Sequence, residues 1–157
     1  MKRTILTATA CIIMLAAGAQ TLTKTKVLKS ADFGNQKITA AITDGDTIYA
    51  VLIATSNRYQ KNIVCGLGHR DEALRLLNYL YEADLKKGDI LELKNETNNI
   101  VTKNPLGGLL VYSEGRQFSG QLRKPNIKSF IKAVRIFCGL EVEEEDNTDE
   151  RYGGRDE

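Results

Sequence analysis

The stretch Gly120–Gly139, GQLRKPNIKSFIKAVRIFCG, predicts the helix around which the rest of the chain is expected to fold. Its apolar residues recur at intervals of three and four, which places them on one face of an α-helix. They are Ile127, Phe130, Ile131, Val134 and Cys138. Pro125 is tolerated in the first turn, because its missing N–H would have no helical partner there. Gly139 is expected to end the helix in a left-handed conformation.

The other side of this helix carries five basic residues, which we call the basic stripe. They are Arg123, Lys124, Lys128, Lys132 and Arg135. Such a stripe suits an anionic glycan, phospholipid head groups or an acidic protein, although amphipathic helices always expose one polar face to water. Nucleic acid is not expected as a partner, because no aromatic residues alternate with the basic ones. The stripe is one of two candidate binding surfaces.

A second helix of the same design is expected 54 positions upstream, with a core stripe of Ala73, Leu76, Leu77 and Leu80. Apolar segments between turn residues predict eight strands, at residues 22–30, 38–43, 47–55, 63–67, 90–93, 100–102, 109–113 and 117–122. The order is therefore ββββα–ββββα. The predicted fold is α+β, a two-layer sandwich in which an antiparallel sheet of about eight strands carries two helices on one face.

The two halves, residues 20–84 and 85–140, align at a constant offset from Val64 to Leu80, which suggests a duplication of the ββββα unit. In this alignment Gly66 matches Gly120, and a glycine beneath each helix would permit close approach. The alignment predicts that Val64 and Gly66 face the helices. Any two strand–helix units share such a pattern, so the alternative is a chance resemblance between the halves.

The face of the sheet that the helices leave uncovered is the second candidate binding surface. If the alignment holds, that face carries Ile63, Cys65 and Leu67. The central strand adds either Tyr49, Val51 and Ile53 or the alternate set Ile48, Ala50 and Leu52. An exposed apolar strip of this kind marks a contact site. The alternatives are that the two half-sheets pack on each other or that loops cover the strip.

Residues 1–19 have the features of a secretory signal peptide. Lys2 and Arg3 precede an apolar run at residues 5–17, and Ala17-Gly18-Ala19 matches a small-residue cleavage site. The run is shorter than the roughly 20 residues that span a bilayer. We therefore expect cleavage after Ala19 and export to the periplasm, the cell surface or the extracellular space, with no membrane span.

Charge divides the remaining chain into a basic domain and an acidic tail. Residues 20–140, expected to form a single domain, hold 18 lysines and arginines against 11 acidic residues. Residues 141–157 hold nine acidic residues against two arginines and few apolar ones, which predicts a disordered tail. The tail is either a solubilising segment or a mask that folds back over the basic stripe.

Two cysteines, Cys65 and Cys138, are expected in the exported chain, where a disulfide would persist. The alternation of Cys65 with Ile63 and Leu67 could turn it toward the helix that carries Cys138. The offset alignment turns Cys65 away instead. The sequence therefore leaves a Cys65–Cys138 disulfide open.

Signals for catalysis are weak in this sequence. His69 is the single histidine and follows Cys65 by four residues, so the two could form a thiolate pair. No spacing of ligands predicts a metal site, and no cofactor is expected. Asn95-Glu96-Thr97 fits an N-glycan acceptor in a eukaryotic secretory route.

The favoured hypothesis is an exported, non-catalytic binding or inhibitor-like module. Its partner would be a protein or an anionic glycan of the cell envelope, held by the sheet face or by the basic stripe. One alternative is a small secreted enzyme that uses Cys65 or His69. The other is a small-molecule carrier with its ligand between helices and sheet.

Overall fold

The computed structural model describes residues 23–55 and 62–142. Its strands are β1 (Lys24–Ala31), β2 (Gln36–Thr43), β3 (Asp46–Ala54), β4 (Asn62–Gly68), β5 (Ile90–Glu92), β6 (Ile100–Lys103), β7 (Leu109–Tyr112) and β8 (Ser119–Leu122). The helices α2 (Arg70–Glu82) and α3 (Lys124–Phe137) follow β4 and β8, and single helical turns lie at Asp32–Gly34 and Glu114–Arg116. The α+β class and the order of elements agree with the prediction.

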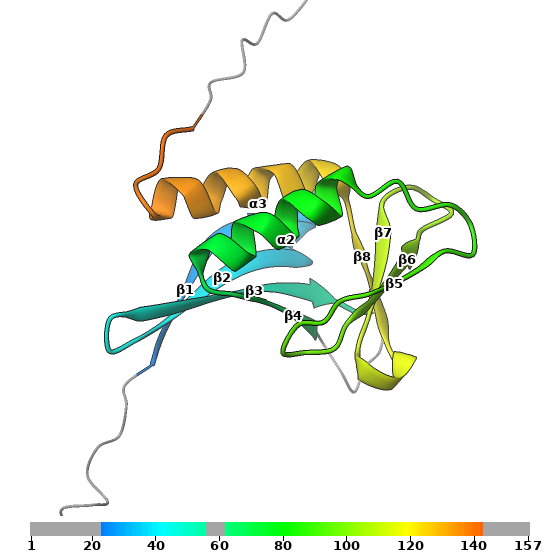
Figure 1. The fold of residues 1–157 in the computed structure, drawn as a ribbon, viewed down its shortest axis with the longest axis horizontal. Helices are drawn as coiled ribbons and strands as arrows, with labels where there is room; N and C mark the ends of the chain where they lie inside the picture. The colour runs from blue at the N-terminus through cyan, green and yellow to red at the C-terminus, as the bar shows by residue number, and fades with distance from the viewer. Residues whose placement is uncertain (1–22, 56–61, 143–157) are drawn as a thin grey trace, which may run out of the picture.

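The eight strands form two sheets. Sheet A has the order β1-β2-β3-β4 and sheet B the order β5-β6-β7-β8, and every neighbouring pair is antiparallel. Strands β7 and β8 of sheet B run crosswise to those of sheet A (Figure 1). The prediction of one continuous eight-stranded sheet is therefore wrong, because β4 and β5 do not pair.

Both helices lie side by side and antiparallel over one face of sheet A (Figure 1). Helix α2 contacts β3 and β4, whereas α3 contacts β1 and α2. Their buried residues repeat the predicted helical spacing: Ala73, Leu77 and Leu80 on α2, and Ile127, Phe130 and Val134 on α3. The second helix thus covers the sheet of the first half. The fold does not confirm a duplication, because the two halves pack differently.

The residues of β3 and β4 that face the helices are the reverse of those predicted by the offset alignment. Ile63, Cys65 and Leu67 are buried, and Val51 and Ile53 pair with Cys65 and Ile63 across the strands. This places Tyr49, Val51 and Ile53 in the core. The alternative that placed this set on the uncovered face, as a candidate binding surface, is therefore wrong. The reason is that a shift of one residue turns every side chain of a strand to the opposite face.

The two glycines predicted beneath the helices lie elsewhere. A Cβ atom on Gly120 would meet Ile53 Cγ2 at 2.5 Å and Ala54 O at 3.0 Å, so Gly120 lets β8 cross close to the end of β3. Gly66 faces the side chain of Thr97 in the β5–β6 loop. Both glycines therefore serve contacts between the two sheets, and their predicted contact with the helices is wrong.

Three side chains of the β5–β6 loop, which we call the Asn95–Thr97–Asn99 cluster, occupy the outer edge of β4. Asn95 Nδ2 donates to Gly66 O (2.8 Å), and the Gly66 N–H donates to Thr97 Oγ1 (2.9 Å). Asn99 Nδ2 donates to the carbonyl oxygens of Val64 and Tyr112, both at 3.1 Å. The cluster takes the place of a fifth strand and joins sheet A to sheet B.

These hydrogen bonds also engage Asn95, the residue that would accept an N-glycan. The amide nitrogen of Asn95 is partly buried and also donates to Asn99 Oδ1 at 3.0 Å. An acceptor nitrogen held in this way is not presented at the surface of the folded domain.

None of the described helices is long and apolar enough to cross a bilayer. The predicted signal peptide at residues 1–19 lies outside the described residues, as does the acidic tail beyond Val142. Export, cleavage after Ala19 and the role of the tail stay predictions.

Candidate functional site

The face of sheet A opposite the helices, which we call the open face, presents an aliphatic surface. Cross-strand register places these residues on it: Val27, Ala41, Ile48, Ala50, Leu52 and Val64. Val27, Ile48 and Val64 are 52%, 37% and 45% exposed, although they are apolar. Of the two sets predicted for the central strand, the structure places Ile48, Ala50 and Leu52 here.

Thr39 is the polar residue at the centre of the open face, and its hydroxyl is already satisfied. Thr39 lies between Val27 and Ala50 across the strands, and its Oγ1 donates to Ala50 O at 3.2 Å. The side chain therefore presents its methyl group beside the aliphatic neighbours. Lys37 borders the patch, opposite Leu52. An apolar centre with a charged border is typical of a protein-binding surface.

The basic stripe consists of two arginines, one near each end of α3, and three lysines. The two arginines at its ends are engaged: Arg123 Nη1 lies 3.8 Å from Asp32 Oδ1, and Arg135 Nε donates to Glu141 O at 2.8 Å. Lys128 and Lys132 are exposed on α3, and Lys124 is partly buried. The two arginines thus connect the ends of α3 to Asp32 and to Glu141. Recognition of an anion by the lysines stays a prediction.

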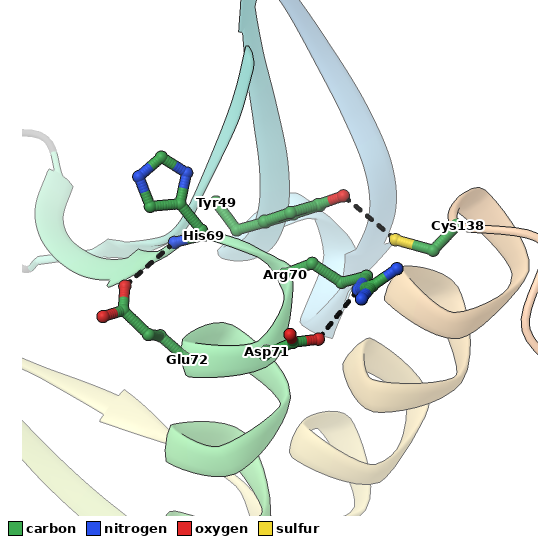
Figure 2. Close-up of polar contacts among 6 residues, drawn as sticks. All are labelled: Tyr49, His69, Arg70, Asp71, Glu72 and Cys138. Carbon is green, nitrogen blue, oxygen red and sulfur yellow. Dashed lines mark hydrogen bonds and ion pairs between the residues drawn. The ribbon is translucent and has the colours of Figure 1, made fainter.

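Cys138 pairs with Tyr49, and not with Cys65. Tyr49 Oη and Cys138 Sγ share a hydrogen bond of 3.1 Å, which joins the end of α3 to β3 (Figure 2). The Tyr49 ring meets that of Phe137 edge-on, with centroids 6.3 Å apart. Burial, and then the contact with Cys138, raises the pKa of Tyr49 above its usual value, so the phenol stays neutral. The contact is a structural anchor for α3.

Both cysteines of the described domain are free thiols. Cys65 lies in the core beneath the helices, where Asn95 Nδ2 approaches its sulfur at 3.8 Å. Burial raises the pKa of the Cys65 thiol to about 12. The disulfide that the sequence left open does not form, because each sulfur has a different neighbour.

His69 does not form a pair with Cys65. It precedes the first residue of α2, and its Nδ1 lies 3.1 Å from Asp46 Oδ1. Its backbone N–H donates to Glu72 Oε2 at 3.2 Å, which fixes the start of the helix (Figure 2). A buried, protonated thiol and an exposed imidazole that faces a carboxylate lack the arrangement of a nucleophile and its base.

The two thiols should differ sharply in reactivity. Iodoacetamide at neutral pH is expected to modify Cys138 at least about tenfold faster than Cys65, because Cys65 is buried and stays protonated. Mass spectrometry of tryptic peptides gives the extent at each site. Labelling in denaturant is the control, where both should react at similar rates. Equal rates in the native protein would contradict the burial of Cys65.

Within the described residues, no group of three or more His, Cys, Asp or Glu side chains is placed to hold a metal ion. Comparison with protein-family models, with curated proteins and with solved structures found no match to this chain. A function is therefore inferred from the surfaces of the folded domain.

Proposed function

We propose that this protein is a binding module that holds a partner protein against the open face of sheet A. The observation that carries the proposal is the aliphatic surface of the open face, on which Val27, Ile48 and Val64 stay exposed around Ala41, Ala50 and Leu52. Burial of such surface contributes about 25 cal/mol per Å². If export occurs as predicted, the partner is a protein of the cell envelope.

The open face supports this proposal better than the basic stripe supports recognition of an anion. The two arginines of the stripe already contact Asp32 and Glu141. Exposed lysines on a helix are common on protein surfaces, whereas several exposed aliphatic residues on one sheet face are less common. Catalysis by Cys65 and His69 has less support, because the two side chains have separate partners.

The origin of the module in a duplication is a separate proposal. The repeated order of four strands and a helix supports it. The opposite orientation of Val64 from that in the offset alignment counts against that particular alignment.

Replacement of Ile48 and Val64 by lysine is expected to weaken capture of the partner from a native envelope extract at least about tenfold, because two charges would be buried in the interface without partners. Ile136→Lys is the matched control, since Ile136 is an exposed aliphatic residue on α3. Quantitative mass spectrometry of the captured proteins is the measurement, and thermal unfolding checks that each variant is folded.

Equal capture by the open-face variant and by the natural protein would refute the proposal. Loss of capture in Lys128→Glu with Lys132→Glu, but not in the open-face variant, would assign the contact to the basic stripe instead.

A further inference from the structure

A cleft of about 550 Å³ separates α2 from the segment that contains β5. One wall comes from β4 and α2 and consists of Leu67, Glu72, Arg75, Leu76 and Tyr79. The other wall is the continuous segment 91–96. Leu76 belongs to the predicted core stripe of α2, yet it is only partly buried because it lines this cleft. The volume is within the roughly 300–1,000 Å³ of ligand sites in proteins.

The second wall contains the end of β5, which is the edge strand of sheet B, and the start of the β5–β6 loop. Strand β5 is the first strand of sheet B and pairs with β6 alone. Successive side chains of a strand point to opposite faces, so the two consecutive strand residues Leu91 and Glu92 both line the cleft only where β5 presents its edge. The cleft is therefore bordered by backbone groups as well as by side chains.

The register identifies which backbone groups face the cleft. The Leu93 N–H donates to Asn99 O at 2.8 Å, and Leu91 lies opposite Val101. Alternate residues of an antiparallel strand direct their N–H and C=O groups to the neighbour and away from it. Leu91 and Leu93 therefore turn toward β6, and Glu92 directs its backbone groups to the open edge.

The outer edges of β4 and β5 differ in how their backbone groups are satisfied. The outer edge of β4 is satisfied by the Asn95–Thr97–Asn99 cluster. Among the described residues, no side chain does the same for the backbone of Glu92. An exposed strand edge pairs most favourably with another extended backbone.

We infer that the α2–β5 cleft binds an extended peptide segment of a partner, which adds to sheet B as a strand beside β5. Its backbone would pair with Glu92, and its alternate side chains would enter the cleft against Leu76 and Tyr79. Three glutamates, Glu72, Glu92 and Glu96, stand against Arg75 and Lys94 in the lining. Charge complementarity therefore favours a peptide that carries apolar residues and a basic one.

The test begins with a library of random peptides displayed on phage and selected on the purified protein. The best enriched sequence is synthesised and its affinity measured by fluorescence anisotropy. Glu92→Pro is expected to weaken binding at least about tenfold, because proline removes the outward N–H and is tolerated on an edge strand. Glu92→Ala, which keeps the N–H, is the matched control for loss of the carboxylate.

A second measurement leaves the protein unchanged. Methylation of a peptide nitrogen whose N–H points toward β5 is expected to abolish binding. Methylation of the next nitrogen along the peptide, whose N–H points away from β5, should have little effect. Selection of no peptide, or binding indifferent both to Glu92→Pro and to methylation, would overturn the inference. Selected sequences that match this chain would assign the cleft to a second copy and would also overturn it.

This test is separate from that of the open face. The variant with Ile48→Lys and Val64→Lys should bind the selected peptide as the natural protein does, because neither residue lines the cleft. Failure of either proposal can therefore be recognised without reference to the other.

Discussion

Asn99→Ala is expected to lower the free energy of unfolding by about 4 kcal/mol, measured by urea denaturation. The Asn99 side chain is buried and donates to the carbonyl oxygens of Val64 and Tyr112, one in each sheet. Its Oδ1 also accepts hydrogen bonds from Asn95 and Thr97. A buried acceptor that loses its donor costs about 1–3 kcal/mol, and this substitution removes the donor from two acceptors that are part-buried. This loss is a large part of the total free energy of unfolding, which is about 5–15 kcal/mol for a typical domain.

Asn78→Ala is the matched control, because Asn78 is exposed on α2, where alanine is a good helix former. It should leave the midpoint of unfolding nearly unchanged. Asn99→Asp keeps the acceptor oxygen and removes both donated bonds, so it should be nearly as destabilising as Asn99→Ala. A cost below about 1 kcal/mol for Asn99→Ala would show that the cluster does not hold the sheets together.

Gly120→Ala is expected to cost about 2–3 kcal/mol of stability, the upper part of the range for overpacking. The added methyl group would lie 2.5 Å from Ile53 Cγ2 and 3.0 Å from Ala54 O. Ile53 is fully buried, so its side chain cannot move aside without disturbing the core. Gly120 does not have a positive φ, so backbone strain does not contribute to the cost.

A double-mutant cycle identifies the cause of that cost. Ile53→Ala removes the atom that the new methyl group would strike, so the double variant should be less destabilised than the sum of the two single ones. Ser119→Ala, on the adjacent and partly exposed residue of β8, is the control and should have a small effect. Strict additivity in the cycle would show that Ile53 is not the neighbour that excludes a side chain at Gly120.

The parts of the fold that depend on local pattern could be predicted from the sequence. Both helices and their buried residues follow from apolar spacing within fewer than 20 residues, and Gly139 ends α3 with a φ of 68°. The division into two sheets depends on contacts between distant segments. Asn99 meets Val64, 35 residues away, and Gly120 meets Ile53. No local pattern specifies such a contact, so adjacent strands were expected to continue one sheet.

The candidate surface was only partly predictable for a related reason. Strand β3 is apolar on both faces, so its own sequence does not indicate which set of side chains is buried. The alternation of Ile63, Cys65 and Leu67 in β4 indicates the buried face correctly. The offset alignment is displaced by one residue and therefore predicts the opposite face. The spacing of Asn95, Thr97 and Asn99 at every second position was a signal for a shared polar face.

The position of α3 has a consequence for the order in which the chain can complete its fold. The helix α3, which contacts β1 and α2, comes after all eight strands in the chain. During synthesis from the amino end, Ile38 and Ala40, which belong to the same buried cluster as Phe130, therefore lack that part of the core until Phe130 has emerged. The first half has its strands but lacks part of its core until nearly the whole domain is present. A chaperone that shields apolar surface would act on this protein in that interval.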